Sequence, residues 1–200
     1  ALPGVDSVTA MEERLGSGWS DNSDMMVDGR LPDVANGASR TVRSNVVGPN
    51  FFHTLGVPVL AGRDFDVRDN DDEPVAAVIN LDFARKYFNS DSPLGRIFTR
   101  DDGVRHQVIG IAGDSRYDTL RGAREPIVYM PMKPPNVFTL YVRSPMTPAM
   151  VSAVVAREAS ALGFGMRIRD VTTLAALVSG TIVTERLLAA VGAGCALLGL

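Results

Sequence analysis

The sequence predicts an α+β fold, because short strand candidates follow one another along the chain and helices occur at only a few places. A strand–helix–strand unit is expected over residues 138–171, and its two strands can lie parallel in one sheet. Continuous apolar runs such as residues 75–79 are typical of buried strands. The length of 200 residues suffices for one large domain or two small ones.

Strands and loops are expected over the first 47 residues. Residues 5–9 follow a Pro-Gly turn and form the first strand candidate. Residues 16–40 are rich in Gly, Ser, Asp and Asn, with a possible strand at 25–27 between loops. Residues 41–47 alternate well enough to predict a further strand.

The segment V-V-G-P-N-F-F-H-T-L-G is the most informative part of the chain. Pro49 can open a one-turn helix, because the N–H that proline lacks is not needed at a first helical position. Phe51, Phe52 and Leu55 then fall on one face of that helix. Gly56 ends it, since glycine accepts the left-handed conformation of many helix ends. A short apolar segment and a Gly-Arg turn follow.

The acidic residues 64–73 lack an apolar period and predict a loop. The elements expected after it are a strand at 75–79, a helix at 82–88, a hairpin of strands 97–100 and 107–111 around Asp102-Gly103, strands at 127–130 and 138–143, a helix at 148–162 and a strand at 166–171. Thr147 can cap the helix at 148–162 and Gly163 can end it. A last helix is expected to begin near Thr173.

Composition excludes several classes of function. The net charge of −3 argues against nucleic-acid binding, because no basic surplus exists to neutralise phosphates. The single cysteine, Cys195, excludes an intramolecular disulfide and a cysteine-cluster metal site. His53 and His106 are the only histidines, which leaves little material for acid–base or metal chemistry.

No catalytic, cofactor or metal site is expected, and the chain is predicted not to be an enzyme. The acidic residues 64–73 lack the order of an EF-hand and favour a solvated loop. Ser115 lacks a Gly-x-Ser-x-Gly elbow, and no Gly-x4-Gly-Lys-Ser/Thr phosphate loop occurs. Arg63 either anchors the turn after Gly62, through carbonyls or an aspartate, or is a solvent-facing charge.

Residues 187–200 are free of charge and rich in small residues. They are fewer than the roughly 20 residues that cross a bilayer, but small residues favour close helix packing in membranes. We expect the start of a truncated transmembrane helix here. A buried helix at the end of a soluble domain is the alternative.

Five motifs, in order, resemble the MacB-like periplasmic core domain of bacterial ABC-transporter permeases of the FtsX/MacB type. They are V-V-G-P-N-F-F-H-T-L-G-V-P-V-L-A-G-R-D-F at 46–65, P-V-A-A-V-I-N-L-D-F-A-R-K-Y-F at 74–88, P-L-G-R at 93–96, V-I-G-I-A-G-D at 108–114 and E-P-I-V-Y-M-P at 125–131. The resemblance covers most of residues 40–190, and the first 40 residues match poorly.

The resemblance implies a two-lobed periplasmic domain. A discontinuous membrane-proximal lobe with the βαβ unit is assigned to residues 1–20 and 132–180, an inserted mixed α/β lobe to 21–131, and a stalk with the start of the membrane helix to 181–200. The residues expected to carry the structural motif, and no catalysis, are Phe51, Phe52, Leu55, Gly56, Gly62, Arg63, Pro93, Gly95 and Pro131.

The resemblance also implies a place and partners. The domain would lie on the periplasmic side of the bacterial inner membrane and couple cytoplasmic ATP hydrolysis to periplasmic conformational change, in efflux or mechanotransmission. Its partners would be a second permease copy, a cytoplasmic ABC ATPase subunit, a periplasmic adaptor in efflux members, and the membrane through the C-terminal helix. Two alternative hypotheses for the function are a periplasmic ligand-binding or sensor domain of a membrane receptor, and a small hydrolase.

Overall fold

The computed structural model describes residues 3–15, 21–31, 41–66, 69, 73–88, 92–114, 125–133, 137–161, 170–177 and 179. In this part of the chain the elements are β1 Ser7–Met11, β2 Asp21–Val27, β3 Thr41–Val47, α1 Phe51–Leu55, β4 Val59–Gly62, β5 Val75–Asn80, α2 Leu81–Phe88, β6 Ile97–Arg100, β7 Arg105–Ala112, β8 Ile127–Pro131, β9 Thr139–Arg143 and α3 Pro148–Ala161. Residues 174–177 are also helical. The fold is mixed α/β, as the sequence predicts.

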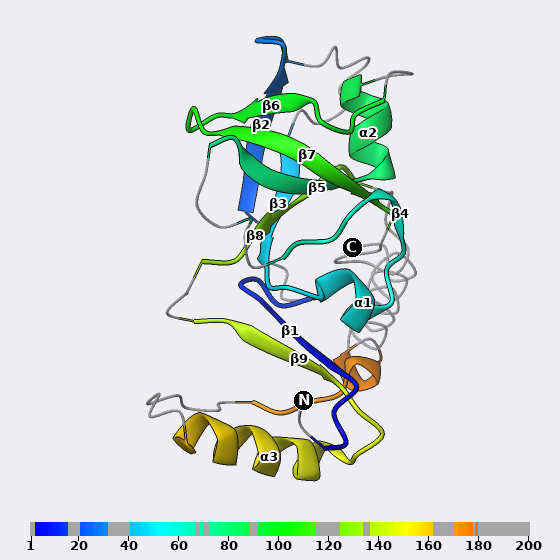
Figure 1. Ribbon diagram of the computed structural model, residues 1–200, viewed down its shortest axis with the longest axis vertical. Helices are drawn as coiled ribbons and strands as arrows, with labels where there is room; N and C mark the ends of the chain where they lie inside the picture. Colours follow the sequence, from blue (N-terminus) through cyan, green and yellow to red (C-terminus); the bar gives the residue numbers. More distant parts are fainter. Residues whose placement is uncertain are drawn as a thin grey trace, which may run out of the picture.

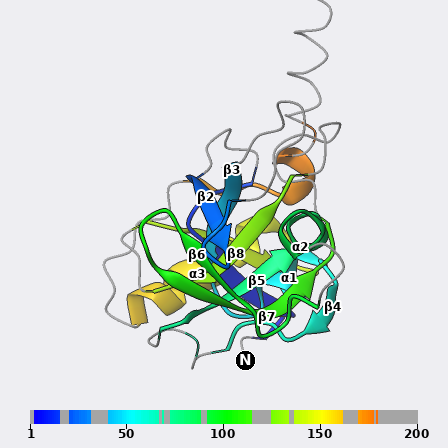
Figure 2. The same cartoon turned by 90° about the horizontal axis from the view of Figure 1, so that it is seen from above.

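Six of the strands close into a barrel. Neighbouring strands are paired in the order β2-β6-β7-β5-β8-β3, and β3 pairs again with β2 (Figures 1 and 2). The pairs β3/β8 and β5/β7 are parallel, whereas the other four pairs of the barrel are antiparallel. Because the barrel is closed, none of its six strands presents a free edge along its whole length.

Every strand of the barrel contributes to its interior. The shared apolar cluster contains Met25 of β2, Val42 of β3, Ile79 of β5, Phe98 of β6, Val108 of β7 and Val128 of β8. Helix α2 packs into the same cluster, and its Phe83 and Tyr87 stack with ring centroids 4.2 Å apart. The helix predicted from this i, i+4 aromatic pair is therefore confirmed.

Asn80 joins helix α2 to the barrel wall. It is the last residue of β5, and its Oδ1 accepts hydrogen bonds from Phe83 N at 2.9 Å and from Ile127 N at 2.9 Å. Its Nδ2 donates to Glu125 O at 2.8 Å. The side chain thus caps the first turn of α2 and holds the start of β8.

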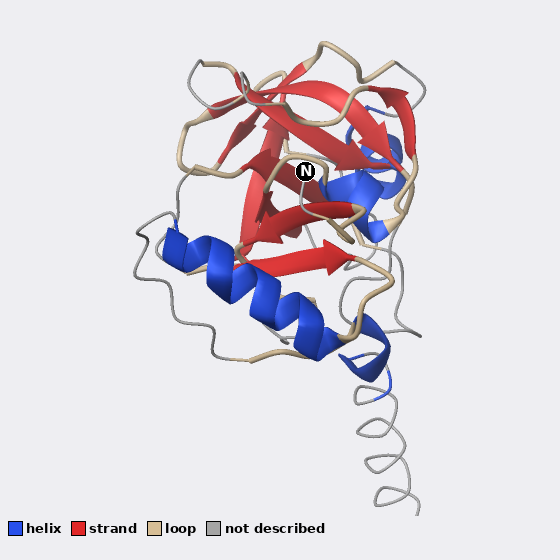
Figure 3. Cartoon of the chain, turned by 60° about the horizontal axis from the view of Figure 1, so that its bottom comes forward, coloured by secondary structure: helices blue, strands red, loops and turns tan. Residues whose placement is uncertain are grey.

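Strands β1 and β9 form a separate two-stranded antiparallel ribbon below the barrel, in the orientation of Figure 1. All five residues of β1 pair with β9, but only Met11 pairs with the barrel, opposite Val47 of β3. Helix α1 lies between this β1–β9 ribbon and the barrel, and α3 lies beyond the ribbon (Figures 1 and 3). Strand β9 and helix α3 are the first two parts of the strand–helix–strand unit predicted over residues 138–171.

Several sequence expectations need correction. Pro49 does not open α1: the helix begins at Phe51 after Asn50, whose φ of 62° is left-handed, a conformation that asparagine tolerates better than most residues. The first strand is Ser7–Met11, two residues later than expected, and β2 begins earlier, at Asp21. The apolar segment after Gly56 includes a strand, β4, which pairs with β7.

Helix α3 carries four apolar residues at helical spacing, Met150, Val151, Val154 and Val155, and the three valines are partly buried. Ala159 is the one buried residue that this helix provides, whereas Met150 is exposed. The predicted strand at 166–171 falls largely outside the described residues, as does the C-terminal stretch 187–200. No helix in the described ranges is long and apolar enough to cross a membrane.

Candidate functional site

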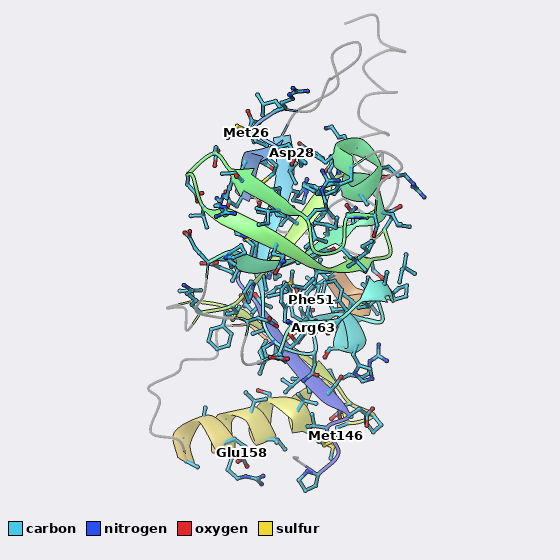
Figure 4. All side chains as sticks on the ribbon, turned by 45° about the horizontal axis from the view of Figure 1, so that its top comes forward. Met26, Asp28, Phe51, Arg63, Met146 and Glu158 are labelled. Carbon is cyan, nitrogen blue, oxygen red and sulfur yellow. The ribbon has the colours of Figure 1, made fainter. Side chains whose placement is uncertain are left out.

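Phe51 and Phe52 lie where the barrel, α1 and the β1–β9 ribbon meet. Each is 1% exposed. Their rings form an edge-to-face pair with centroids 5.1 Å apart, and both contact Tyr129 of β8, with centroids at 5.4 and 5.0 Å. Figure 4 shows Phe51 at this level of the molecule, above strand β1. The two phenylalanines thus occupy one buried aromatic cluster.

Leu55 and Gly56 close the same helix. Leu55 is only partly buried, although it packs against the cluster around the two phenylalanines. Gly56 has φ of 73°, and Val57 N donates to Phe52 O at 2.9 Å, so the chain turns away from the helix as expected. Thr54, which the sequence pattern did not single out, is buried on this helix.

Gly62 is required by a close approach of two strands. It ends β4 with φ of 74°, and a Cβ atom there would overlap the carbonyl oxygen of Ile109 on β7. Gly110 is its partner across the pair, and a Cβ at Gly110 would overlap the carbonyl oxygen of Arg63. The Gly-Arg turn therefore has no room for a side chain on either strand.

Arg63 holds the loop that follows this turn. Its guanidinium donates to both carboxylate oxygens of Asp69, at 2.7 and 2.7 Å, and to Asp64 O at 3.1 Å. Asp69 Oδ2 also accepts from Asp66 N at 2.7 Å. The Arg63 guanidinium keeps the pKa of Asp69 below its ordinary value. Arg63 thus makes the carbonyl and aspartate contacts of the first alternative, while its guanidinium is also half exposed to solvent.

Replacing Arg63 by methionine is expected to lower the free energy of unfolding by about 1 kcal/mol at pH 7. The guanidinium is half exposed, which limits the value of the pair, but the two-point geometry places it at the upper end for surface ion pairs. Because the pKa of Asp69 is lowered, the contribution is present above pH 4 and is lost as the pH falls through the folded-state value. Urea unfolding at pH 7 measures the loss, with Arg105→Met, at the exposed first residue of β7, as the control. Equal losses in both variants would contradict a stabilising role of the Arg63–Asp69 pair.

Pro93 and Gly95 form a turn against the wall of the barrel. Arg96 N donates to Pro93 O at 3.1 Å, and Gly95 N donates to Val108 O at 2.8 Å. Gly95 has φ of 78°. Pro131 is the last residue of β8 and is paired with Val47. The nine motif residues thus spread along the chain from α1 to the end of β8.

The residues considered for chemistry do not converge in the described part of the chain. His53 is exposed on α1, whereas His106 is buried inside the barrel, stacked on Phe98 with ring centroids 5.2 Å apart. Ser115 lies outside the described residues. In the described ranges, no three His, Cys, Asp or Glu side chains are grouped so that they could hold a metal ion.

His106 makes the fold sensitive to acid. Burial lowers the pKa of His106 to about 4, from 6.5. The unfolded chain therefore takes up this proton at a higher pH than the folded chain does. The stability due to neutral His106 is complete above pH 6.5 and declines as the pH falls from 6.5 toward 4, by about 3 kcal/mol in all.

Unfolding free energies measured from pH 7 to pH 4.5 should show this decline in the parent chain. His106→Leu should remove most of it, because the titrating group is gone. His53→Gln, at an exposed histidine, should leave the decline in place. A decline of equal size in His106→Leu would assign the acid sensitivity to other groups.

The fold combines a six-stranded barrel, a two-stranded ribbon and a buried aromatic cluster between them. The MacB-like periplasmic core domain family model matches residues 2–181. The chain belongs to this family, the periplasmic domain of ABC transporter permeases. No curated protein sequence matches it.

Three solved structures share the fold. The periplasmic region of MacB from Actinobacillus actinomycetemcomitans has 15% identity and a TM-score of 0.56, covering 80% of this chain and 69% of that one. The extracellular domain of the noncanonic ABC-type transporter YknZ from Gram-positive bacteria has 18% identity and a TM-score of 0.53, covering 86% and 83%. A domain of a putative permease protein from Porphyromonas gingivalis has 18% identity and a TM-score of 0.51, and the match covers 80% of this chain and 71% of that one.

Proposed function

We propose that this domain couples ATP hydrolysis by a cytoplasmic ABC ATPase subunit to conformational change on the periplasmic side of the inner membrane, in efflux or mechanotransmission. The family match over residues 2–181 is the observation that carries the proposal. ABC transporters work with ATPase subunits, so a periplasmic domain of such a permease receives motion rather than nucleotide. The domain acts without catalysis of its own, and with a second permease copy and, in efflux, a periplasmic adaptor.

The proposed function divides the domain into two lobes. The β1–β9 ribbon and α3 belong to the lobe assigned to residues 1–20 and 132–180, and the barrel belongs to the lobe assigned to 21–131. The chain passes between ribbon and barrel twice, after β1 and after β8. The first lobe stands next to the membrane and the barrel extends into the periplasm.

Residues 181–200 form the stalk and the start of a membrane helix. The support is the uncharged run 187–200, which follows Glu185 and Arg186. In the full-length permease in intact cells, Cys195 should resist membrane-impermeant thiol reagents, whereas a Thr181→Cys variant should react from the periplasm. Equal, rapid labelling at both positions would place the run outside the bilayer.

Coupling is tested in the full-length permease, reconstituted in nanodiscs with its ATPase. A spin label at exposed Arg105 on β7, in each of two copies, should report different distances with ATP and with ADP. An ATPase variant that binds but cannot hydrolyse ATP should hold one of these states. Identical distance distributions in every nucleotide state would contradict coupling.

A further inference from the structure

The two phenylalanines are not simply core residues of the barrel. The strands of the barrel alternate, so Ala77 and Ile79 of β5 point into it and Ala76 and Val78 point outward. Phe51 and Phe52 belong to the outward cluster, together with Val78 and with Met11 of β1. One apolar cluster therefore contains side chains from the barrel, from α1 and from the β1–β9 ribbon.

Strand β9 contributes to the same contact from its inner face. Tyr141 packs against the cluster, and its Oη accepts a hydrogen bond from Leu15 N at 3.0 Å. Arg143, on the same face, donates from Nε to Thr54 O at 3.1 Å, at the C-terminal end of α1. A cation at this position donates a hydrogen bond to a carbonyl at the helix end, and it interacts favourably with the partial negative charge there.

Strand β1 is fixed to β3 at the same level. Gly48 N donates to Ala10 O at 2.8 Å, and Glu12 N donates to Val46 O at 3.0 Å. Thr9 Oγ1 donates to Gly48 O at 3.2 Å, and this threonine is buried. Polar contacts thus surround the apolar cluster on both strands of the ribbon.

We propose that these contacts form a rigid junction, through which the β1–β9 ribbon and the barrel move as one body. We define the junction as Met11, Phe51, Phe52, Tyr141 and Arg143. Apart from it, the described contacts that join ribbon and barrel are the hydrogen bonds of residues 9–13 with β3 and Gly48, and two covalent connections. This inference rests on the proposed function. In that function, the junction transmits a displacement of the ribbon to the barrel, because the two cannot rotate relative to each other.

Distances between spin labels test the junction in the chain of 200 residues, with Cys195→Ser as the background. One pair, Val8→Cys on β1 and Arg105→Cys on β7, spans the junction. A second pair, Leu60→Cys on β4 and Arg105→Cys, lies within the barrel assembly and reports its integrity. The expected parent result is a single narrow distribution for both pairs.

The double variant Tyr141→Ala/Arg143→Ala should at least double the width of the spanning distribution and leave the second pair unchanged. Leu140→Ala is the matched control, because Leu140 is the neighbour on β9 that faces the other way and is exposed. Tyr141→Phe with Arg143 intact should keep the distribution narrow, since the aromatic packing stays.

Two results would overturn the proposal: a spanning distribution that is already broad in the parent, or one whose width does not change in the double variant. If both distributions broaden in the double variant, the single variant Tyr141→Leu is measured instead. The proposal then requires that Tyr141→Leu broaden the spanning distribution and leave the second one unchanged. None of these outcomes depends on which side of a membrane the domain occupies, so failure here is distinct from failure of the proposed function.

Discussion

Phe52→Ala is expected to lower the free energy of unfolding by about 3–5 kcal/mol. Its ring is 1% exposed and contacts Phe51, Phe65 and Tyr129, with centroid distances of 5.1, 6.3 and 5.0 Å. Truncation removes the transfer free energy of the ring and leaves a cavity among side chains from three elements. Aromatic edge-to-face contacts are lost in addition.

Denaturant unfolding followed by circular dichroism measures the loss. Leu60→Ala on β4 is the control, because Leu60 is 52% exposed and its truncation should change stability by less than about 1 kcal/mol. Similar small effects in both variants would show that the aromatic cluster is not a stabilising core.

Gly62→Ala is expected to cost about 2–5 kcal/mol. A left-handed backbone costs an alanine about 1–2 kcal/mol. The overlap of the new Cβ with Ile109 O, which is backbone and cannot rotate away, adds about 1–3 kcal/mol from forced separation of β4 and β7. The variant tests whether the Gly-Arg turn exists to let two strands approach closely.

Gly95→Ala separates the cost of the left-handed backbone from the cost of the Cβ overlap. Gly95 has φ of 78°, close to the 74° of Gly62, but apart from its own chain neighbours no atom is found within 4 Å of its Cβ position. It should therefore show only the backbone cost of about 1–2 kcal/mol. Equal losses at both glycines would mean that the strands separate without penalty.

Local signals predicted most of the elements. Gly56 predicted the end of α1, although not its start, and the apolar run before Asn80 predicted β5, because turn chemistry and periodicity act over a few residues. The hairpin of β6 and β7 followed from Asp102-Gly103 in the same way.

Long-range pairing was beyond such signals. Closure of the barrel depends on β2 meeting β3 on one side and β6 on the other, and nothing within β2 specifies either partner. The sequence could not say which of the six acidic residues in 64–73 pairs with Arg63; the structure has a two-point contact with Asp69 at 2.7 Å and a longer one with Asp66 at 3.7 Å. Tyr141 and Arg143 belong to a predicted strand, but their contacts with Leu15 and Thr54 depend on a fold that places β9 beside α1.

If this domain lies on the periplasmic side of the membrane as part of a permease, an exposed residue of its barrel is accessible from outside in intact cells. The full-length permease carrying Leu60→Cys in a Cys195→Ser background is treated with a membrane-impermeant maleimide before and after lysis. Leu60 is 52% exposed on the barrel side, so its reactivity depends on compartment and not on burial. We predict full labelling in intact cells, with no gain on lysis, while a cytoplasmic cysteine reference reacts only after lysis. If the Leu60→Cys variant is labelled only after lysis, the periplasmic location of the domain is contradicted.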